Sequence, residues 1–426
     1  MSRRLPRAEW LLTRKIHAPP ALLYAILMQV AKFLAWRDNT HFSYNAYPGR
    51  GKGPIVMIAN HASRVDYEFV GPPCRPKRLN FVVGYNEFFR FPTSILLPIM
   101  QVIPKKNFTP DRYAVREILR AVKSGCSICI MPEGMSSITG MAQPIIPGGA
   151  KLVKKLGLPV YYAKIAGGYL TYTKHCLDRR RGRVEVTVDR MFTAEQLQTL
   201  SEAEIEDTMN RLLAHDDYLW NERAQVRFLG KSPMAKRLET LLYLCPRCGA
   251  LHRMVSEGDT LRCEACGNTV RIDETYALHP AGGSECPAHV TDWTILERQR
   301  AAQEVRREDF RHSGRVRVGV LPERKLLYGD KTSESRGEGL LTLDHGGLHF
   351  DGTLDGAPYR FDIPSAQLPT YGMCTDISRF YLFPEGRFME FSPEAGDVLW
   401  WDHLTEELHR YQGGKWQNIP YRHTEP

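Results

Sequence analysis

The sequence contains no apolar run long enough to cross a bilayer as a helix. The N-terminal stretch from Ala21 to Ala31 is short, and its extension to Trp36 takes in the charged Lys32, whereas a spanning helix needs about 20 apolar residues. Two prolines precede the stretch and no small-residue cleavage site follows it, so a removable signal peptide is not expected. These absences exclude a polytopic membrane protein and favour a segment that lies on a membrane surface.

A disulfide framework is also missing, although the chain has ten cysteines. Four of them form two CxxC pairs, and the others show no framework spacing, namely Cys74, Cys126, Cys129, Cys176, Cys286 and Cys374. This pattern predicts a reducing compartment and one metal site. A composition of 43% hydrophobic and 25% charged residues, without repeats or low-complexity tracts, excludes a disordered chain.

Positive charge is concentrated at the N-terminal end. The formal net charge is +9, and residues 1–60 contain nine Lys or Arg against two acidic residues, beginning with Arg3, Arg4, Arg7, Arg14 and Lys15. Trp10, Tyr24 and Trp36 suit the headgroup level of a membrane. We therefore predict that residues 1–36 form membrane-associating helices, which place a peripheral or monotopic protein on the cytoplasmic side of a membrane. A buried core helix stays open as the alternative.

An α/β pattern begins after Gly53. Apolar and β-branched runs alternate with helical lengths, and the main runs are Ile55–Ala59, Leu79–Val83, Cys126–Met131 and Pro159–Ile165. Such alternation predicts an α/β domain with a mostly parallel sheet. We assign this domain to residues 37–235 and expect it to close with one helix from Glu202 to Arg223.

A histidine and an aspartate follow the first predicted strand. His61 and Asp66 are five residues apart, which on one helix would set them about 140° apart. Ser63 and Asp66 have the spacing of a capping box, so we expect a helix to begin at Ser63 and Asp66 to reach back to His61. A carboxylate on one imidazole nitrogen leaves the other free to accept a proton from an alcohol. A structural histidine beside a helix N-terminus is the alternative.

A second predicted strand, Cys126–Met131, is followed by a loop that contains Glu133. Open α/β sheets bind ligands at the carboxyl edge of their strands, where this loop is expected to lie. The motifs read Asn60-His61-x-Ser63-x-x-Asp66, then Pro132-Glu133-Gly134, then Gly157-Leu158-Pro159-Val160. Their order resembles the glycerolipid acyltransferase family of 1-acylglycerol-3-phosphate acyltransferases, over residues 20–225.

The resemblance implies that a fatty acyl group moves from acyl-coenzyme A or acyl carrier protein to a hydroxyl of a lysolipid or related lipid in a membrane. His61 would be the general base and Asp66 its orienting partner. Glu133 and Gly134 would match the motif that shapes the acceptor pocket, and our candidate acceptor-binding residues are Asn60, Ser63, Lys105, Lys106, Glu133, Gly134 and Ser136.

Two positions depart from the family pattern. Family members usually have an Arg in the segment that here contains Lys105 and Lys106, and another where this chain has Ser136. Because Arg holds phosphate through two bonds and Lys offers a point charge, we expect weakened phosphate recognition, with Arg112 and Lys164 as further candidates. This favours a lysophospholipid with a larger headgroup, or a non-phosphorylated alcohol, over lysophosphatidate.

The two CxxC pairs form a second unit, residues 236–275. A glycine follows each pair, and the ligand set is Cys245, Cys248, Cys263 and Cys266. This spacing is typical of a zinc ribbon that holds one structural zinc ion. The ribbon has few basic residues and little aromatic interleaving, so no nucleic-acid partner is expected.

The remaining chain is divided into a linker with a charged helix, residues 276–311, and a β-rich domain, residues 312–414. The helix, expected from Asp292 to Phe310, mixes Arg and Glu and is interpreted as a solvated spacer. Short alternating segments predict a small antiparallel domain closed by a C-terminal helix, which faintly resembles a pleckstrin-homology domain. The sequence predicts no particular protein partner for this domain. The whole sequence predicts a membrane-associated acyltransferase, or alternatively a catalytically silent lipid-binding or scaffolding protein that retains the fold.

Overall fold

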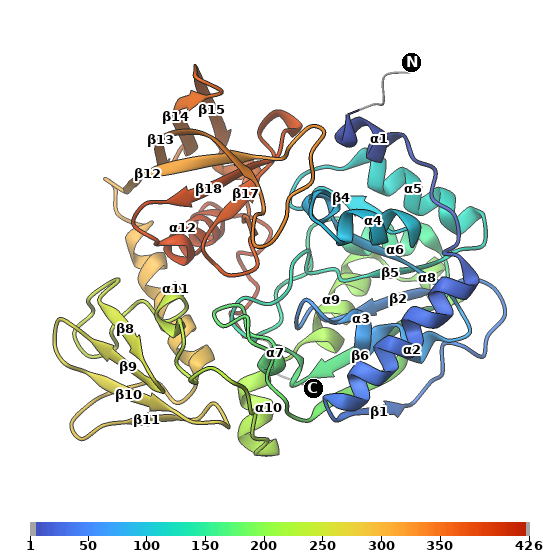
Figure 1. Ribbon diagram of the computed structural model, residues 1–426, viewed down its shortest axis with the longest axis horizontal. Coiled ribbons are helices and arrows are strands. Elements are labelled where there is room, and N and C mark those ends of the chain that lie inside the picture. Colours follow the sequence, from blue (N-terminus) through green and yellow to red (C-terminus); the bar gives the residue numbers. More distant parts are fainter. Residues whose placement is uncertain (1–5, 423–426) are drawn as a thin grey trace.

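The computed structural model describes residues 6–422, so Arg3 and Arg4, which belong to the predicted membrane segment, lie outside the described residues. The described chain forms a seven-stranded sheet near the N-terminus, a four-stranded sheet in the middle and another seven-stranded sheet near the C-terminus. Figure 1 shows the first sheet with its helices on the right, and the other two sheets on the left.

The first sheet has the strand order β1-β7-β6-β2-β5-β3-β4. Every neighbouring pair is parallel except β6 with β7, which confirms the predicted mostly parallel α/β sheet. The strands are β1 (Thr40–Tyr44), β2 (Val56–Ala59), β3 (Leu79–Gly84), β4 (Ile103–Lys105), β5 (Ser127–Ile130), β6 (Val160–Ala166) and β7 (Val184–Phe192).

Strand β2 shows how the sheet acquires two apolar faces. Successive side chains of a strand point to opposite faces, and here Val56 and Ile58 pack with α5, α6 and α9, whereas Met57 and Ala59 pack with Phe69 of α3. Figure 1 shows α2 and α3 in front of the sheet and α6, α8 and α9 behind it. The bounds are α3 (Tyr67–Val70), α4 (Thr93–Ile99), α5 (Arg112–Lys123), α6 (Gly149–Leu156), α7 (Gly168–Thr171) and α8 (Ala194–Thr199).

The predicted single helix from Glu202 to Arg223 is wrong. It is two helices, α9 (Glu202–Leu213) and α10 (Asp217–Ala224). The chain breaks because the carboxylate of Asp216 accepts hydrogen bonds from the backbone N–H of Tyr218 (3.0 Å) and Leu219 (3.1 Å), which is the geometry of a helix N-cap.

Of the two N-terminal helices, α2 lies in front of the sheet and α1 lies above α4 in the view of Figure 1. They are α1 (Arg7–Thr13) and α2 (Ala21–Arg37). One face of α2 is buried through Tyr24, Met28, Ala31 and Ala35, a spacing of three or four residues that fits one side of a helix. Within residues 6–422, no helix combines the length and the apolar character needed to cross a membrane.

The middle sheet is fully antiparallel and carries the four predicted ligand cysteines on and beside its strands. Its order is β11-β10-β9-β8. The strands are β8 (Met254–Glu257), β9 (Thr260–Cys263), β10 (Thr269–Ile272) and β11 (Leu278–Pro280).

The charged helix after the ribbon is not a solvated spacer, so that interpretation is wrong. It is α11 (Val290–Glu304), and its buried residues include Trp293 and Glu297, both 0% exposed. The Glu297 carboxylate accepts from the backbone N–H of Tyr243 (2.7 Å) and Leu244 (3.0 Å), and the indole N–H of Trp293 donates to the Leu244 carbonyl (2.7 Å). The helix therefore anchors the segment that enters the ribbon.

The C-terminal sheet is antiparallel, with the order β15-β14-β13-β12-β18-β17-β16. The strands are β12 (Arg311–Val320), β13 (Glu334–Asp344), β14 (Gly347–Leu354), β15 (Ala357–Pro364), β16 (Gly372–Met373), β17 (Phe380–Leu382) and β18 (Met389–Pro393). Helix α12 (Val398–Tyr411) follows, and its buried Trp401 lies against His312 and Phe380 of this sheet.

The three sheets are joined by one apolar cluster. It contains Tyr169 and Tyr218 of the first unit, Leu261 of the ribbon, and Phe391 and Trp401 of the C-terminal unit. Tyr169 follows β6 and Met135 follows β5, and both belong to this cluster. The loops at the carboxyl edge of the first sheet are therefore packed against the other two units.

Candidate active site and metal centre

The predicted pair of His61 and Asp66 is in contact. Nδ1 of His61 lies 2.8 Å from Oδ2 of Asp66, whose side chain is buried. The helix, however, begins at Tyr67 and not at Ser63. The Asp66 carboxylate instead accepts from the Ser63 backbone N–H (2.9 Å) and hydroxyl (3.0 Å), and this turn brings it back to His61.

The carboxyl group of Asp66 is buried and hydrogen-bonded within this turn. Burial raises the pKa of Asp66, while the hydrogen bonds from His61 and Ser63 oppose that rise. The carboxylate on Nδ1 orients the ring and stabilises a positive imidazolium, and it directs Nε2 away from the pair. The His61 side chain is 24% exposed, so a substrate has a route to this ring.

Glu133 holds the backbone of His61. Its side chain is buried, and its two oxygens accept from the backbone N–H of His61 (2.7 Å) and of Gln143 (2.8 Å). Burial raises the pKa of Glu133 to about 7. The carbonyl of His61 in turn accepts from the Ser137 N–H at 2.7 Å. The loop after β5 thus holds the backbone of His61 through both its N–H group and its carbonyl group.

Asn60 and Ser63 also have contacts within the protein. The side-chain amide of Asn60 donates to the Ile165 carbonyl (2.9 Å), and its oxygen accepts from the Ile165 N–H (2.7 Å). The side chain therefore continues the pairing of β2 with β6 beyond the end of β2. Ser63 donates hydrogen bonds to the Asp66 carboxylate from its backbone N–H and its hydroxyl.

Lys105, the last residue of β4, and Lys106 lead into a segment that packs against the Pro-Glu-Gly loop. Phe108, two residues beyond Lys106, packs where a side chain at Gly134 would stand, and Gly134 has a φ of +84° that favours glycine. Nζ of Lys105 lies 3.2 Å from the Lys106 carbonyl, and burial lowers the pKa of Lys105. The segment after β4 and the Pro-Glu-Gly loop therefore lie together at one edge of the sheet.

Lys106 contacts the C-terminal unit. Its ammonium donates to the carbonyl of Gly386 at 2.6 Å and lies 5.6 Å from the ring centre of Tyr85 and 5.7 Å from that of Phe383. Next to it, the side chain of Asn107 donates to the Tyr381 hydroxyl at 3.3 Å. The C-terminal domain therefore covers the segment that was expected to hold the acceptor phosphate.

The other predicted acceptor residues lie in different settings. Ser136 is 9% exposed, in a loop whose neighbours Met135 and Ile138 belong to the apolar cluster shared with the other units. Lys164 lies on β6, and Arg112 is the exposed first residue of α5.

A second histidine and aspartate pair lies beside His61, and sequence reasoning missed it. His215 contacts Asp217, whose carboxylate accepts from the backbone N–H of Gly167 and Tyr169, each at 2.7 Å. Both residues line a cavity of about 10 Å³ that His61 and Glu133 also line. That volume fits about one water molecule. In the sequence, the signal for a break at this place was Asp216, a residue type that often caps helices, inside the segment that was expected to form one helix.

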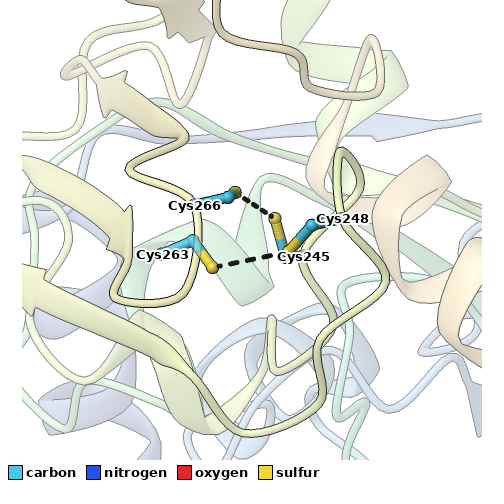
Figure 2. Close-up of side chains that lie close together, drawn as sticks. All are labelled: Cys245, Cys248, Cys263 and Cys266. Atoms are coloured by element: carbon cyan, nitrogen blue, oxygen red, sulfur yellow. Dashed lines mark hydrogen bonds between the residues drawn. The ribbon is translucent and has the colours of Figure 1, made fainter.

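The four predicted ligand cysteines come together (Figure 2). Their sulfur atoms all lie within 4.8 Å of one another, with Cys245 and Cys266 3.6 Å apart and Cys248 and Cys263 3.8 Å apart. A tetrahedral ion with Zn–S bonds of about 2.3 Å requires sulfur atoms roughly 3.8 Å apart. The residues present therefore fit a four-thiolate metal site, and zinc remains the prediction for its occupant.

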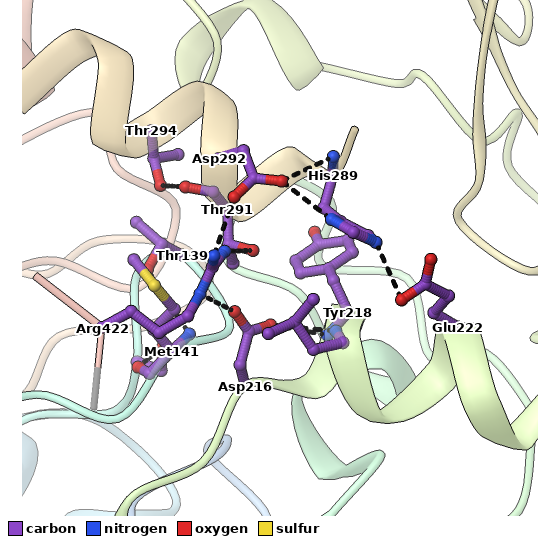
Figure 3. A network of polar contacts seen from close by, with 12 residues as sticks. Thr139, Met141, Asp216, Tyr218, Glu222, His289, Thr291, Asp292, Thr294 and Arg422 are labelled. Carbon is purple, nitrogen blue, oxygen red and sulfur yellow. Dashed lines mark hydrogen bonds and ion pairs between the residues drawn. The ribbon is translucent and has the colours of Figure 1, made fainter. Parts of the chain in front are cut away.

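A polar network connects Arg422 to Asp216, which stands between the cavity-lining residues His215 and Asp217 in the sequence (Figure 3). The guanidinium of Arg422 donates to Asp216 (2.9 Å), Asp292 (2.8 Å) and the Thr291 hydroxyl (2.7 Å). Nδ1 of His289, the residue that precedes α11, lies 2.8 Å from the carboxylate of Asp292. The network ties α10 to the start of α11.

Residues 39–164 match the family model named Acyltransferase. This match identifies an acyltransferase domain in that segment, which lies within the span of the resemblance found in the sequence. Among solved structures, the chain is similar to the 1-acyl-sn-glycerophosphate acyltransferase from Thermotoga maritima, with 16% identity and a TM-score of 0.37. That similarity covers 45% of this chain and 79% of the other.

Proposed function

We propose that the protein is a membrane-associated O-acyltransferase that moves a fatty acyl group from an acyl thioester to a hydroxyl of a lipid acceptor. The observation that carries the proposal is the 2.8 Å contact between Nδ1 of His61 and Asp66 at the end of β2, inside the segment that matches the acyltransferase family. The donor is acyl-coenzyme A or acyl carrier protein.

In the proposed reaction, Nε2 of His61 accepts the proton of the acceptor hydroxyl while its oxygen attacks the thioester carbonyl carbon. The imidazolium that forms is stabilised by Asp66, whose position depends on Ser63. The C–S bond then breaks, and the departing thiolate takes the proton from Nε2. General-base catalysis of this kind contributes roughly 10² to 10⁴-fold, and positioning supplies much of the remainder.

The acceptor that we propose is a lysophospholipid with a larger headgroup or a non-phosphorylated alcohol. Lys106 is engaged by the Gly386 carbonyl and two aromatic rings, and Ser136 is nearly buried. A phosphate at Lys106 would have to displace these contacts. This contact pattern favours acceptors that do not depend on a phosphate grip in that loop.

Membrane association is proposed to occur through the exposed face of α2. Its large apolar side chains are exposed on the side opposite the buried face, and they are Leu22, Ile26, Val30, Phe33 and Trp36. Trp36 is 72% exposed, which costs free energy in water because apolar surface stays hydrated. Contact with the cytoplasmic side of a membrane, aided by the basic residues of the N-terminal segment, removes that cost.

A catalytically silent lipid-binding or scaffolding role is the second candidate. The covering of Lys106 by the C-terminal unit favours it, because a protein without acceptor turnover needs no open phosphate site. The intact His61–Asp66 pair favours the enzyme.

The test uses purified full-length protein, acyl-coenzyme A and a panel of lysolipids and alcohols, with release of free thiol as the readout. We expect acceptor-dependent release by the wild type and its loss in His61→Ala. Equal release by both proteins would refute the mechanism, and no release with any acceptor would favour the silent role. His41, an exposed residue of β1, provides the matched control His41→Ala.

A further inference from the structure

The loop between β12 and β13, residues 321–333, leaves the C-terminal unit and lies against the acyltransferase domain. The N–H of Phe91 donates to the Leu327 carbonyl (2.8 Å), and the N–H of Leu327 donates to the Phe89 carbonyl (2.9 Å). The carbonyl of Glu323 accepts from the N–H of Arg7 at 2.9 Å. The loop is therefore fixed beside α1 and the start of α4.

The exposed side of this junction is apolar and aromatic. Tyr328 is 60% exposed and Phe91 47% exposed, and their ring centres lie 5.5 Å apart. The same side of α4 carries exposed Ile95, Leu96 and Ile99. Isolated apolar side chains on a surface are ordinary, but a contiguous patch marks an interaction site.

The junction shares a buried core with the N-terminal helices. Leu327 of the loop is buried in the same apolar cluster as Leu11 of α1 and Met28 of α2, with Leu97 of α4 packed against it. The loop is therefore anchored in the same core as α1, α2 and α4.

Charge favours an anionic lipid surface over a second copy of the chain. The exposed basic residues of the loop, Arg324, Lys325 and Lys331, outnumber its exposed acidic residues, Glu323 and Asp330. Arg7 and Arg14 donate to carbonyls of α4, at Ser94 and at Pro98. Basic groups around an apolar, aromatic patch suit headgroups and acyl chains at once, whereas two copies would bring like charges together.

We propose that the C-terminal domain is a second membrane-docking element, which inserts Tyr328 at the headgroup level and holds anionic lipids through Arg324 and Lys325. The proposal rests on the membrane association within the proposed function and assigns part of it to a different domain. Docking at two places fixes the tilt of the protein on the bilayer, so that the edge carrying His61 keeps one distance from the lipid surface.

The test measures the partitioning of full-length protein onto vesicles of phosphatidylcholine with and without phosphatidylglycerol. Tyr328→Ser is expected to weaken binding to both kinds of vesicle by about tenfold, because its aromatic area leaves the interface. The Arg324→Ser, Lys325→Ser double variant is expected to lose about fivefold per charge on anionic vesicles only. Tyr411→Ser, a half-exposed tyrosine of the same domain, is the matched control.

Further variants distinguish a failure of this proposal from a failure of the proposed function. Lys151→Ser with Lys155→Ser removes equal charge from α6, behind the sheet, and should bind normally. If Phe33→Ser on α2 weakens binding and both loop variants bind like wild type, the loop proposal is overturned and the α2 anchor stands. The loop proposal would also be overturned if the wild-type protein does not bind vesicles but forms dimers that Tyr328→Ser dissociates. That result would show that a second copy of the chain covers the loop. Thiol release is measured separately and reports on the acyltransferase proposal alone.

Discussion

Replacing Glu133 with Gln tests how the acyltransferase loop supports His61. The native carboxylate accepts two backbone N–H groups, from His61 and Gln143, in a buried position. Gln keeps the size of the side chain but offers one acceptor oxygen, so its amide nitrogen must face one of these N–H groups. A buried N–H left without a partner costs about 1–3 kcal/mol.

The pH dependence of this substitution follows from linkage. The pKa of Glu133 is raised by burial from 4.5 to about 7. Between these values the folded protein binds more protons at this site than the unfolded chain, so the stability due to Glu133 falls as pH rises from below 4.5 to above 7. At 1.36 kcal/mol per pKa unit, the decrease amounts to about 3 kcal/mol. Gln does not titrate and lacks this decrease.

The assay is urea unfolding of both proteins at a series of pH values from 4.5 to 8. The free energy of unfolding of Glu133→Gln, relative to wild type, is expected to increase by about 3 kcal/mol across this range. In the proposed reaction the variant should also lose roughly tenfold to 100-fold in kcat/KM, because the backbone of His61 shifts. Parallel pH profiles for the two proteins would refute the reasoning.

Three other perturbations have defined outcomes. Changing the four ligand cysteines to Ser, or chelating the metal, should lower the melting temperature of the ribbon and its neighbours, with Cys126→Ser as control, and an unchanged melting curve would rule out a structural ion. Asp66→Asn should lower kcat by about 10² to 10⁴-fold with little change in KM, and full activity would exclude its orienting role. Lys106→Ala should lower the free energy of unfolding by about 1 kcal/mol in thermal unfolding, because the contact with Gly386 is lost. The variant should keep its KM for phosphorylated acceptors within about threefold of wild type, and a tenfold rise would instead place the phosphate at Lys106.

The features that sequence predicted best are local. The His61–Asp66 contact spans five residues, and the strand before it is an uninterrupted apolar run, so the turn chemistry of a few side chains decides the geometry. The four-cysteine cluster is similar, because each CxxC pair forms its own turn, and the first pair precedes β8 while the second begins at the end of β9, with which β8 pairs. The α/β pattern of the first domain follows from alternation of apolar runs and helical lengths.

The features that sequence missed depend on contacts between distant segments. Helix α11 looks like a charged spacer, but Glu297 is buried because it receives two N–H groups from residues more than fifty positions earlier. Lys106 looks like a free basic group, yet it bonds to Gly386 in another domain. A periodic pattern reports one element at a time, and it carries no information on which loop of another domain will cover that element.

The most direct measurement of the central claim is acyl transfer by wild type, His61→Ala and His41→Ala, with the lipid product identified by mass spectrometry. The account predicts an acylated lipid from wild type and His41→Ala at equal rates, and a rate at least 10²-fold lower for His61→Ala. Product formation by His61→Ala at the wild-type rate would contradict the assignment of His61 as the general base.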